Sequence, residues 1–389
     1  MSGSEQRVLV LNCGSSSVRA AILQVGRSRV ERTATATISR LGPDAVMRIT
    51  RGHAAAVESP SAGNHEAALH AVLDALSIDD APVSVGHRIV HGGPDRAGPA
   101  RVDTALIAEL RRLVPLAPLH QEAGLRGIEL AAELLPGIPQ VACFDTAFHR
   151  SMPPEAQRLP LPAALFDEGV RRYGFHGLSC QHVVESLGAE RLGRAIIAHL
   201  GAGASLTAVR AGRSVDTTMG FTPTGGMIMA TRSGDLDPSI LIHLIDRHGY
   251  DARRLEQLVE HESGLAGVSG TSGDMQALLA HRADDPAAAL AVELFCREAR
   301  KHVGALATVL GGLDTLVFTG GIGEHAAIVR GSICASLEHL GIELDEARNA
   351  RAEAVISSDS SACAVRVVPT DEEAVIARQT AQVALAELS

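Results

Sequence analysis

Residues 8–23, VLVLNCGSSSVRAAIL, set two apolar runs on either side of a turn made of glycine and serine. This pattern is typical of a β-hairpin with a turn of small residues. A similar unit, AIIAHLGAGASLTAVRAG, follows at residues 195–212, so that Gly14 aligns with Gly203 and Ser16 with Ser205. The repeat predicts two domains built on one plan.

Strand and helix signals alternate along the rest of the chain. Apolar runs predict strands at 83–85, 140–144 and 195–199. Capping residues and apolar periodicity predict helices at 64–77, 103–114 and 121–135, and further helices opening at Asp237-Pro238, at Asp285-Pro286 and near Asp371. Residues 313–324, LDTLVFTGGIGE, predict a buried strand, a glycine turn and a helix start. The alternation predicts an α/β protein.

Length and composition narrow the class of protein. The 389 residues exceed what one hydrophobic core normally serves, and 46% hydrophobic with 21% charged residues is ordinary for a globular chain. The formal net charge of −10 disfavours nucleic acid and anionic membranes as partners. We find no apolar leader and no run of about 18 apolar residues, so we expect a cytoplasmic protein without a membrane partner.

The cysteines indicate a reducing compartment. Six are present and none forms a CxxC pair. In a large chain without a leader they are expected to be reduced and mostly buried.

Three glycine turns follow apolar strands, in LNCGSSSVR (11–19), HLGAGAS (199–205) and FTGGIGE (318–324). Turns of small residues can direct backbone N–H groups at an anion without interference from side chains. None of them is a Walker A motif. Because three such turns occur in one chain, a nucleotide-binding role is favoured over a purely structural role as tight turns.

Four side chains are suited to handling an anion. Arg88, in GHRIVHGG, comes just after an apolar strand and beside a glycine turn, and Arg232 lies in a loop ahead of a capped helix. Asp145 follows the strand at 140–144, where α/β proteins keep their sites. His176 lies between two glycines and is placed to contact a transferring phosphoryl group.

Eleven segments then match one family in order: LNCGSSSVR, GHRIVHGG, LAPLHQ, FDTAFHRSMP, RRYGFHG, HLGAGAS, SVDTTMGFTP, TRSGDLDP, SGTSGDM, FTGGIGE and PTDEEAVIAR. The matches run from about residue 7 to residue 378, and the segments closely resemble the acetate kinases of the acetate and propionate kinase family. The resemblance implies the sugar kinase, Hsp70 and actin type of fold, with two duplicated ribonuclease H-like α/β domains around a central cleft. We expect an N-terminal domain of residues 1–149 plus 373–389 and a C-terminal domain of residues 150–372.

The resemblance also implies site residues. Asp145, His176 and Arg232 match catalytic positions. Positions for the carboxylate substrate are matched by Arg88, Val90, Leu119, His120, Phe175 and Pro223. Nucleotide positions are matched by Arg19, His199, Leu200, Gly201, Ala202, Gly203, Asp274, Met275, Gln276, Gly321, Ile322, Gly323, Glu324 and His325. Asn12 and Glu372 match positions associated with Mg²⁺, for which Mn²⁺ is an alternative.

Several positions depart from the commoner family pattern, mostly on the nucleotide side. Arg19 stands where lysine is usual, and Ala202, Gln276 and His325 replace asparagine, arginine and asparagine. Asp371 replaces an asparagine, Gly225 a glutamate and Cys180 a histidine. The departures indicate a divergent branch.

The activity implied is reversible transfer of the γ-phosphoryl group of ATP to acetate, giving acetyl phosphate and ADP, by a homodimer. A carboxylate is already an anion at neutral pH, so it attacks phosphorus in line without a general base. Asp145 is then an orienting group. The alternatives are a propionate or other short-chain carboxylate kinase, a sugar kinase or chaperone of the same fold, and a non-catalytic protein that binds nucleotide or acyl phosphate.

Overall fold

The computed structural model describes residues 5–14, 17–27, 29–39, 41–52, 54–60, 62–76, 82 and 84–385; Ser16 lies outside these residues, and so does the side chain of Leu119. The chain divides into unit 1, Met1–Arg150 with Asp371–Ser389, and unit 2, Ser151–Thr370. The sequence predicts boundaries at 149/150 and 372/373. The units of the structure differ from this by one or two residues, because Arg150, Asp371 and Glu372 belong to unit 1.

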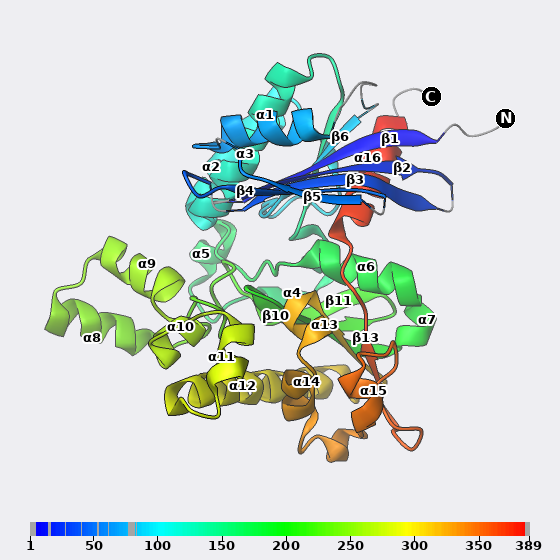
Figure 1. The fold of residues 1–389 in the computed structure, drawn as a ribbon. Helices are drawn as coiled ribbons and strands as arrows, with labels where there is room; N and C mark the ends of the chain where they lie inside the picture. The colour runs from blue at the N-terminus through cyan, green and yellow to red at the C-terminus, as the bar shows by residue number, and fades with distance from the viewer. Residues whose placement is uncertain are drawn as a thin grey trace. The chain divides into compact units, whose positions relative to one another are not determined.

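Unit 1 is built on a sheet that has eight strands within the described residues, in the order β5-β4-β3-β2-β1-β6-β8-β7 (Figure 1). Its strands are β1 (Gln6–Gly14), β2 (Ser17–Val25), β3 (Val30–Ser39), β4 (Val46–Arg51), β5 (Ala54–Glu58), β6 (Ser84–Ile89), β7 (Ala100–Arg101) and β8 (Gln140–Phe144). Its helices are α1 (His65–Ala75), α2 (Thr104–Arg112), α3 (Pro118–Leu134) and α16 (Glu372–Leu385). Two short 3₁₀ turns are η1 (Val114–Leu116) and η2 (Ala147–Ser151), and the last residue of η2 belongs to unit 2.

Unit 2 contains a second sheet, in the order β11-β10-β9-β12-β13. Its strands are β9 (Arg194–Leu200), β10 (Ala204–Arg210), β11 (Arg213–Thr217), β12 (Thr315–Thr319) and β13 (Ala364–Val367). Its helices before β12 are α4 (Pro154–Gln157), α5 (Ala163–Asp167), α6 (Gly177–Leu187), α7 (Ala189–Leu192), α8 (Pro238–His248), α9 (Ala252–His261), α10 (Gly264–Ser269), α11 (Met275–His281) and α12 (Pro286–Leu310). After β12 come α13 (Gly320–His325), α14 (Ala327–Cys334), η3 (Glu338–Leu340) and α15 (Glu346–Ala350).

The two sheets share one topology. In unit 1, β1 pairs antiparallel with β2, and β2 with β3, while β1, β6 and β8 run parallel. In unit 2, β9 pairs antiparallel with β10, and β10 with β11, while β9, β12 and β13 run parallel. The order β3-β2-β1-β6-β8 therefore repeats as β11-β10-β9-β12-β13. This confirms the duplicated α/β fold that the two hairpin sequences predicted.

Helices cover both faces of the unit 1 sheet. Leu9, Leu11 and Ile22 share one buried cluster with Leu69 of α1 and Leu130 of α3. On the opposite face α16, red in Figure 1, packs on the sheet, where a Cβ at Gly86 would lie 2.7 Å from Ile376 Cγ2. Burial of this kind stabilises a fold by roughly 25 cal/mol per Å² of apolar surface. The result is a rigid support for residues at the carboxyl ends of β6 and β8.

Three sequence predictions need correction. β3, β4 and β5 were not predicted, because strands with many exposed residues show weak apolar alternation. α3 begins at Pro118 and not at residue 121, because proline at the first helical position lacks the N–H that would be unsatisfied there. Arg88 lies inside β6 and not after it.

Candidate active site

Arg88 and Asp145 lie on neighbouring parallel strand ends in unit 1. β6 pairs with β8 so that Arg88 stands opposite Cys143, and Asp145 is the first residue after β8. Arg88 Nη2 donates to Asp145 Oδ2 at 2.7 Å, and Nε donates to Oδ1 at 3.1 Å. Asp145 is 1% exposed. A paired guanidinium held by a buried carboxylate is fixed in direction as well as charge.

A second carboxylate faces the same arginine. Glu372 Oε2, at the start of α16, lies 3.6 Å from Arg88 Nε. Burial alone would lower the pKa of Arg88, but the charges of Asp145 and Glu372 outweigh burial and raise the pKa above its ordinary value. Arg88 is therefore a permanent cation near the carboxyl end of β6.

The start of α16 is held by further ion pairs. Glu373 pairs with Arg19 of β2 and with Arg32 of β3, and Asp371 also pairs with Arg32. Asn12 of β1 stands directly opposite Arg19 in the sheet. The two residues predicted to be associated with a metal, Asn12 and Glu372, thus both belong to unit 1, while Arg19 contacts a carboxylate of its own unit.

The loop after β6 is ordered by buried polar contacts. Gln121 of α3 accepts from the backbone N of His91 at 3.2 Å and donates to its carbonyl at 3.0 Å. Gly93 N donates to His91 Nδ1 at 2.9 Å, so this ring nitrogen is an acceptor. Burial lowers the pKa of His91 to about 4. Val90, predicted to contact substrate, begins this loop, and His120 neighbours Gln121 on α3.

In unit 2, His176 occupies a left-handed backbone conformation just before α6, with φ 58°. Few residues other than glycine adopt this region, and such strain is concentrated at functional sites. Its Nδ1 hydrogen-bonds with Ser205 Oγ at 2.9 Å, and its ring stacks on that of His199 with 4.2 Å between centroids. Phe175, predicted to contact substrate, is buried beside it.

Gly203 lies close to two predicted catalytic side chains. A Cβ there would stand 2.9 Å from Arg232 Nη2 and 3.2 Å from His176 Nε2. Arg232 Nη1 donates to the carbonyl of Pro223 at 2.7 Å. Burial lowers the pKa of Arg232, and Glu260 partly offsets this. The backbone of the glycine turn, the imidazole and the guanidinium therefore meet at one place in unit 2.

A chain of hydrogen bonds links His199 to the turn after β12. His199 Nδ1 bonds with Ser179 Oγ at 2.8 Å, and Ser179 Oγ with Thr370 Oγ1 at 3.1 Å. Glu324 Oε1 accepts from the backbone N of Thr370 at 2.9 Å and of Gly320 at 3.1 Å. The Glu324 carboxylate, which we predicted on the nucleotide side, thus binds backbone N–H groups of unit 2.

Three predicted nucleotide segments line one pocket of unit 2, of about 640 Å³. The lining residues are Gly201, Ala202, Gly273, Asp274, Met275, Gln276, Leu279, Gly321, Ile322, His325 and Ala326. The volume falls in the range of small-molecule sites. Six other predicted nucleotide residues are not among its lining residues: Arg19, which belongs to unit 1, and His199, Leu200, Gly203, Gly323 and Glu324 of unit 2. Leu200 is buried at the end of β9.

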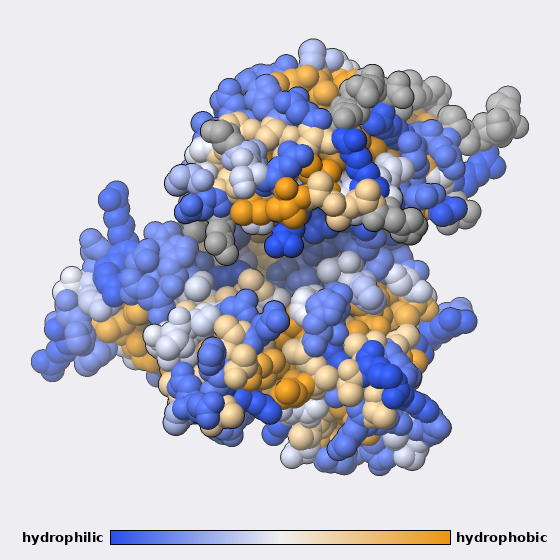
Figure 2. Space-filling model, viewed as in Figure 1, coloured by the Kyte–Doolittle hydropathy of each residue, from blue (hydrophilic) through white to orange (hydrophobic). Residues whose placement is uncertain are grey.

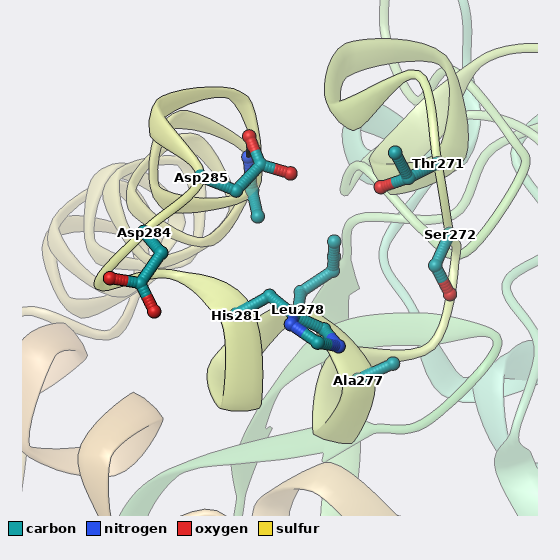
Figure 3. A pocket seen from close by; sticks show the side chains of 8 residues that line it. Thr271, Ser272, Ala277, Leu278, His281, Asp284 and Asp285 are labelled. Carbon is teal, nitrogen blue, oxygen red and sulfur yellow. Dashed lines mark hydrogen bonds between the residues drawn. The ribbon is translucent and has the colours of Figure 1, made fainter.

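A second pocket of unit 2, of about 450 Å³, uses other residues of α11 (Figure 3). Thr271 and Ser272 lie on one side of it and Asp284 and Asp285 on the other, with His281 between them. Asp285 caps α12, accepting from Ala287 N at 2.9 Å. None of the predicted site residues lines this pocket.

Sequence reasoning did not single out Ser179, Thr370, Arg32 or Glu373 as part of the site. Ser205 appeared only as the counterpart of Ser16 in the repeat. Serine and threonine carry no pattern signal of their own, and their hydrogen bonds join residues up to 191 positions apart. All six cysteines are free and buried, as predicted. No helix in the described part of the chain is long and apolar enough to cross a membrane.

The comparisons with known proteins define the class of this protein, a phosphotransferase with two α/β units. The model of the Acetokinase family matches residues 7–378. The chain belongs to this family.

Individual relatives agree with this assignment. The chain is 44% identical to an acetate kinase of Streptomyces avermitilis, with 97% of each chain covered. It is 42% identical to a propionate kinase of Citrobacter rodentium, with 98% of each chain covered. Among solved structures, the acetate kinase of Porphyromonas gingivalis matches at a TM-score of 0.86 and 37% identity, covering 97% of this chain and 99% of that one. A propionate kinase of Francisella tularensis matches at 0.91 and 34%, with the same coverage.

Proposed function

We propose that this chain is an acetate kinase, which transfers the γ-phosphoryl group of ATP to acetate to give acetyl phosphate and ADP, and catalyses the reverse reaction. The observation that carries the proposal is the paired hydrogen bonding of Arg88 to Asp145 in a member of the acetokinase family. A fixed guanidinium suits a carboxylate substrate because the two groups match in geometry and charge.

The carboxylate oxygen of the substrate attacks the γ-phosphorus in line, and the bond to the β-phosphate oxygen breaks as ADP leaves. No proton has to be removed from the nucleophile, because acetate is ionised at neutral pH. Catalysis therefore depends on position and on compensating the charge of the equatorial oxygens. Arg88 orients the nucleophile, and Asp145 is a positioning residue that holds Arg88.

His176 and Arg232 act on the transferring group. Gly203 leaves room for both side chains beside the backbone of the turn, so a phosphoryl group there meets an imidazole and a guanidinium together. Ser205 sets the direction of the His176 ring through Nδ1, and Ser179 does the same for His199. The imidazole and the guanidinium can therefore compensate the negative charge of the phosphoryl group. Their electrostatic interaction with it becomes stronger when water is excluded from the site.

The nucleotide occupies the 640 Å³ pocket of unit 2, with the glycine turns at 201–203 and 320–323 toward its phosphates. Uncharged Gln276 and Ala202 replace the residues usual in the family. Recognition of the adenosine therefore relies on shape and on backbone groups more than on a cationic side chain. Gln276 is exposed at the rim, where its amide can hydrogen-bond a base.

Mg²⁺ would be held by Asn12 and Glu372. Their amide and carboxylate oxygens are the hard donors that Mg²⁺ prefers, and a nucleotide enzyme needs only one or two protein ligands besides phosphates and water. When bound, the ion neutralises charge on the phosphates. The Glu372 side chain is 17% exposed, so its carboxylate is accessible to an ion from solvent.

Propionate is the second candidate acceptor, and a specific observation favours considering it. Relatives named propionate kinase match this chain about as well as those named acetate kinase. From the family resemblance, Val90, Leu119, Phe175 and Pro223 are proposed to contact the substrate methyl or ethyl group. His120 is proposed as a further active-site histidine. One methylene in an apolar pocket changes the free energy by only about 1–3 kcal/mol, so both acids can be substrates.

A homodimer is proposed from an apolar face of unit 2. Neither α8 nor α9 has a buried residue, although α8 and the residue before its cap carry Leu236, Ile240, Ile242 and Ile245, each 44–59% exposed. Figure 2 shows hydrophobic surface on this helical arm, at the left of unit 2. An apolar face of this kind marks an interface, and a second copy of the chain covers it symmetrically.

The reduced cysteines and the ATP requirement support a cytoplasmic location.

The test is a panel of acyl acceptors with ATP and Mg²⁺, in which acyl phosphate is trapped as its hydroxamate. Acetate is expected to give the highest kcat/KM, with propionate second and butyrate far behind. Arg88→Ala should abolish most of kcat. Failure of all three acids, in the presence of tight ATP binding, would support a non-catalytic binding protein.

A further inference from the structure

Arg330, on α14, is a fully buried arginine that no part of the proposed mechanism uses. It is 0% exposed and is the largest of the fully buried side chains in the described chain. Burial of a guanidinium is costly unless its N–H groups are satisfied. The hydrogen bonds of the Arg330 guanidinium therefore indicate its role in the structure.

The acceptors of Arg330 are all neutral oxygens. Nη1 donates to the carbonyls of Gly323 at 2.9 Å and Glu324 at 2.8 Å. Nε donates to Asn349 Oδ1 at 2.8 Å, and Nη2 donates to the Asn349 carbonyl at 2.7 Å. Asn349, on α15, is itself anchored by donating to the carbonyl of Ala327 at 3.0 Å.

The contacts with Gly323 and Glu324 cap the carboxyl end of the short helix α13. α13 stops at His325, so its last carbonyls have no partner in a following turn. Arg330 satisfies two of them, and a cation is favourable at the carboxyl end of a helix. The other end is closed by Glu324, whose carboxylate accepts from Gly320 N. α13 is thus held at both ends.

The same helix forms one wall of the nucleotide pocket, through Gly321, Ile322 and His325. We propose that Arg330 is a positioning residue for the nucleotide, which holds this wall in its binding geometry through the carbonyls of Gly323 and Glu324. This rests on the proposed assignment of the pocket to ATP. Burial also lowers the pKa of Arg330, in agreement with an environment that offers it no carboxylate.

The experiment compares Arg330→Met and Arg330→Lys with a matched control, Arg300→Met. Arg300 donates to the carbonyls of Ile333 and Ser332 at the other end of α14, away from the pocket. We expect both Arg330 variants to raise KM for ATP about tenfold and to leave KM for acetate within about twofold, because hydrogen bonds from a charged group are lost. Arg300→Met should leave both KM values unchanged.

Three outcomes would overturn the inference. A wild-type KM for ATP in Arg330→Lys would mean that charge alone suffices, since one ammonium cannot span the three acceptor residues. Equal effects in Arg300→Met would point to general packing of α14. A parallel rise in KM for acetate would point to global damage. If Arg330→Met does not fold, Asn349→Ala removes one acceptor of Arg330, and the same selective rise in KM for ATP is expected; no rise contradicts the inference.

Leu279→Trp separates this inference from the proposed function, because it fills the pocket from α11 without touching Arg330. A strong loss of ATP binding supports the pocket assignment. If Leu279→Trp binds ATP normally, the assignment of the pocket fails, whatever the Arg330 variants do. If it loses ATP while Arg330 variants do not, only the role of Arg330 is wrong.

Discussion

At the scale of single residues, the absence of a side chain at Gly203 is a requirement of the site. Gly203→Ala would place a methyl group 2.9 Å from Arg232 Nη2 and 3.2 Å from His176 Nε2. Displacing either group by a fraction of an ångström should lower kcat/KM by about tenfold or more. Gly304→Ala is the control, because a Cβ there meets nothing within 4 Å and lies in α12. Steady-state kinetics of both variants provide the measurement. A wild-type kcat/KM in Gly203→Ala would contradict this role of the glycine turn.

Asp145 should act through Arg88. Asp145→Asn keeps hydrogen-bond acceptance at one oxygen but removes the charge, so we expect kcat to fall by about 10- to 100-fold, less than in Asp145→Ala. Glu109→Gln breaks the more exposed pair with Arg96 and should leave kcat unchanged. Equal losses in Asp145→Asn and Asp145→Ala at every pH would indicate a role for the carboxylate other than orientation.

At the scale of elements, β6, β8 and α3 enclose a neutral histidine. His87 is 2% exposed and lies 2.6 Å from the side chain of Gln140. In the amide orientation of Gln140 that satisfies the hydrogen bonds of both amide atoms, the nitrogen donates to His87 Nε2 and to Ile128 O. The amide oxygen then accepts from Ala132 N. Burial lowers the pKa of His87 to about 4, against a partial opposing effect of Gln140.

This predicts a pH dependence of stability. Between about pH 6.5 and pH 4 the unfolded chain binds a proton that the folded His87 does not, so stability is complete above pH 6.5 and decreases as pH falls toward 4. The loss is up to about 3 kcal/mol. Urea unfolding of His87→Gln should show a shallower decrease than wild type over this range. His70→Gln, at an exposed position of α1, is the control and should match wild type. An unchanged slope in His87→Gln would show that His87 titrates normally in the fold.

At the scale of the whole molecule, the apolar arm of α8 and α9 should control assembly. Wild type is expected to have twice the chain mass of 40.5 kDa by light scattering. Ile242→Asp combined with Ile245→Asp should give monomers, because charge at the centre of an apolar interface is costly. Leu290→Asp, at an exposed apolar residue of α12, should remain a dimer. A monomeric wild type, or a double variant that stays dimeric, would exclude this face as the interface.

The sequence by itself determined the duplicated fold, because the hairpins at 8–23 and 195–212 carry local signals: apolar runs, small turn residues and caps such as Asp285 before Pro286. It also placed Arg88, Asp145, His176 and Arg232 on candidate sites, because charged residues beside glycine turns and strand ends are visible in one dimension.

Only the tertiary structure decided which of these groups meet. The pairing of Arg88 with Asp145 spans 57 positions, and the contact of Ser179 with Thr370 spans 191. Arg330 is the clearest case. Its sequence neighbours suggest an ordinary helical arginine, whereas packing of α14 against α13 and α15 buries it and directs its N–H groups to the end of α13 and to Asn349. Long-range packing determines burial and hydrogen-bond partners, and these have no periodicity that a sequence pattern can reveal.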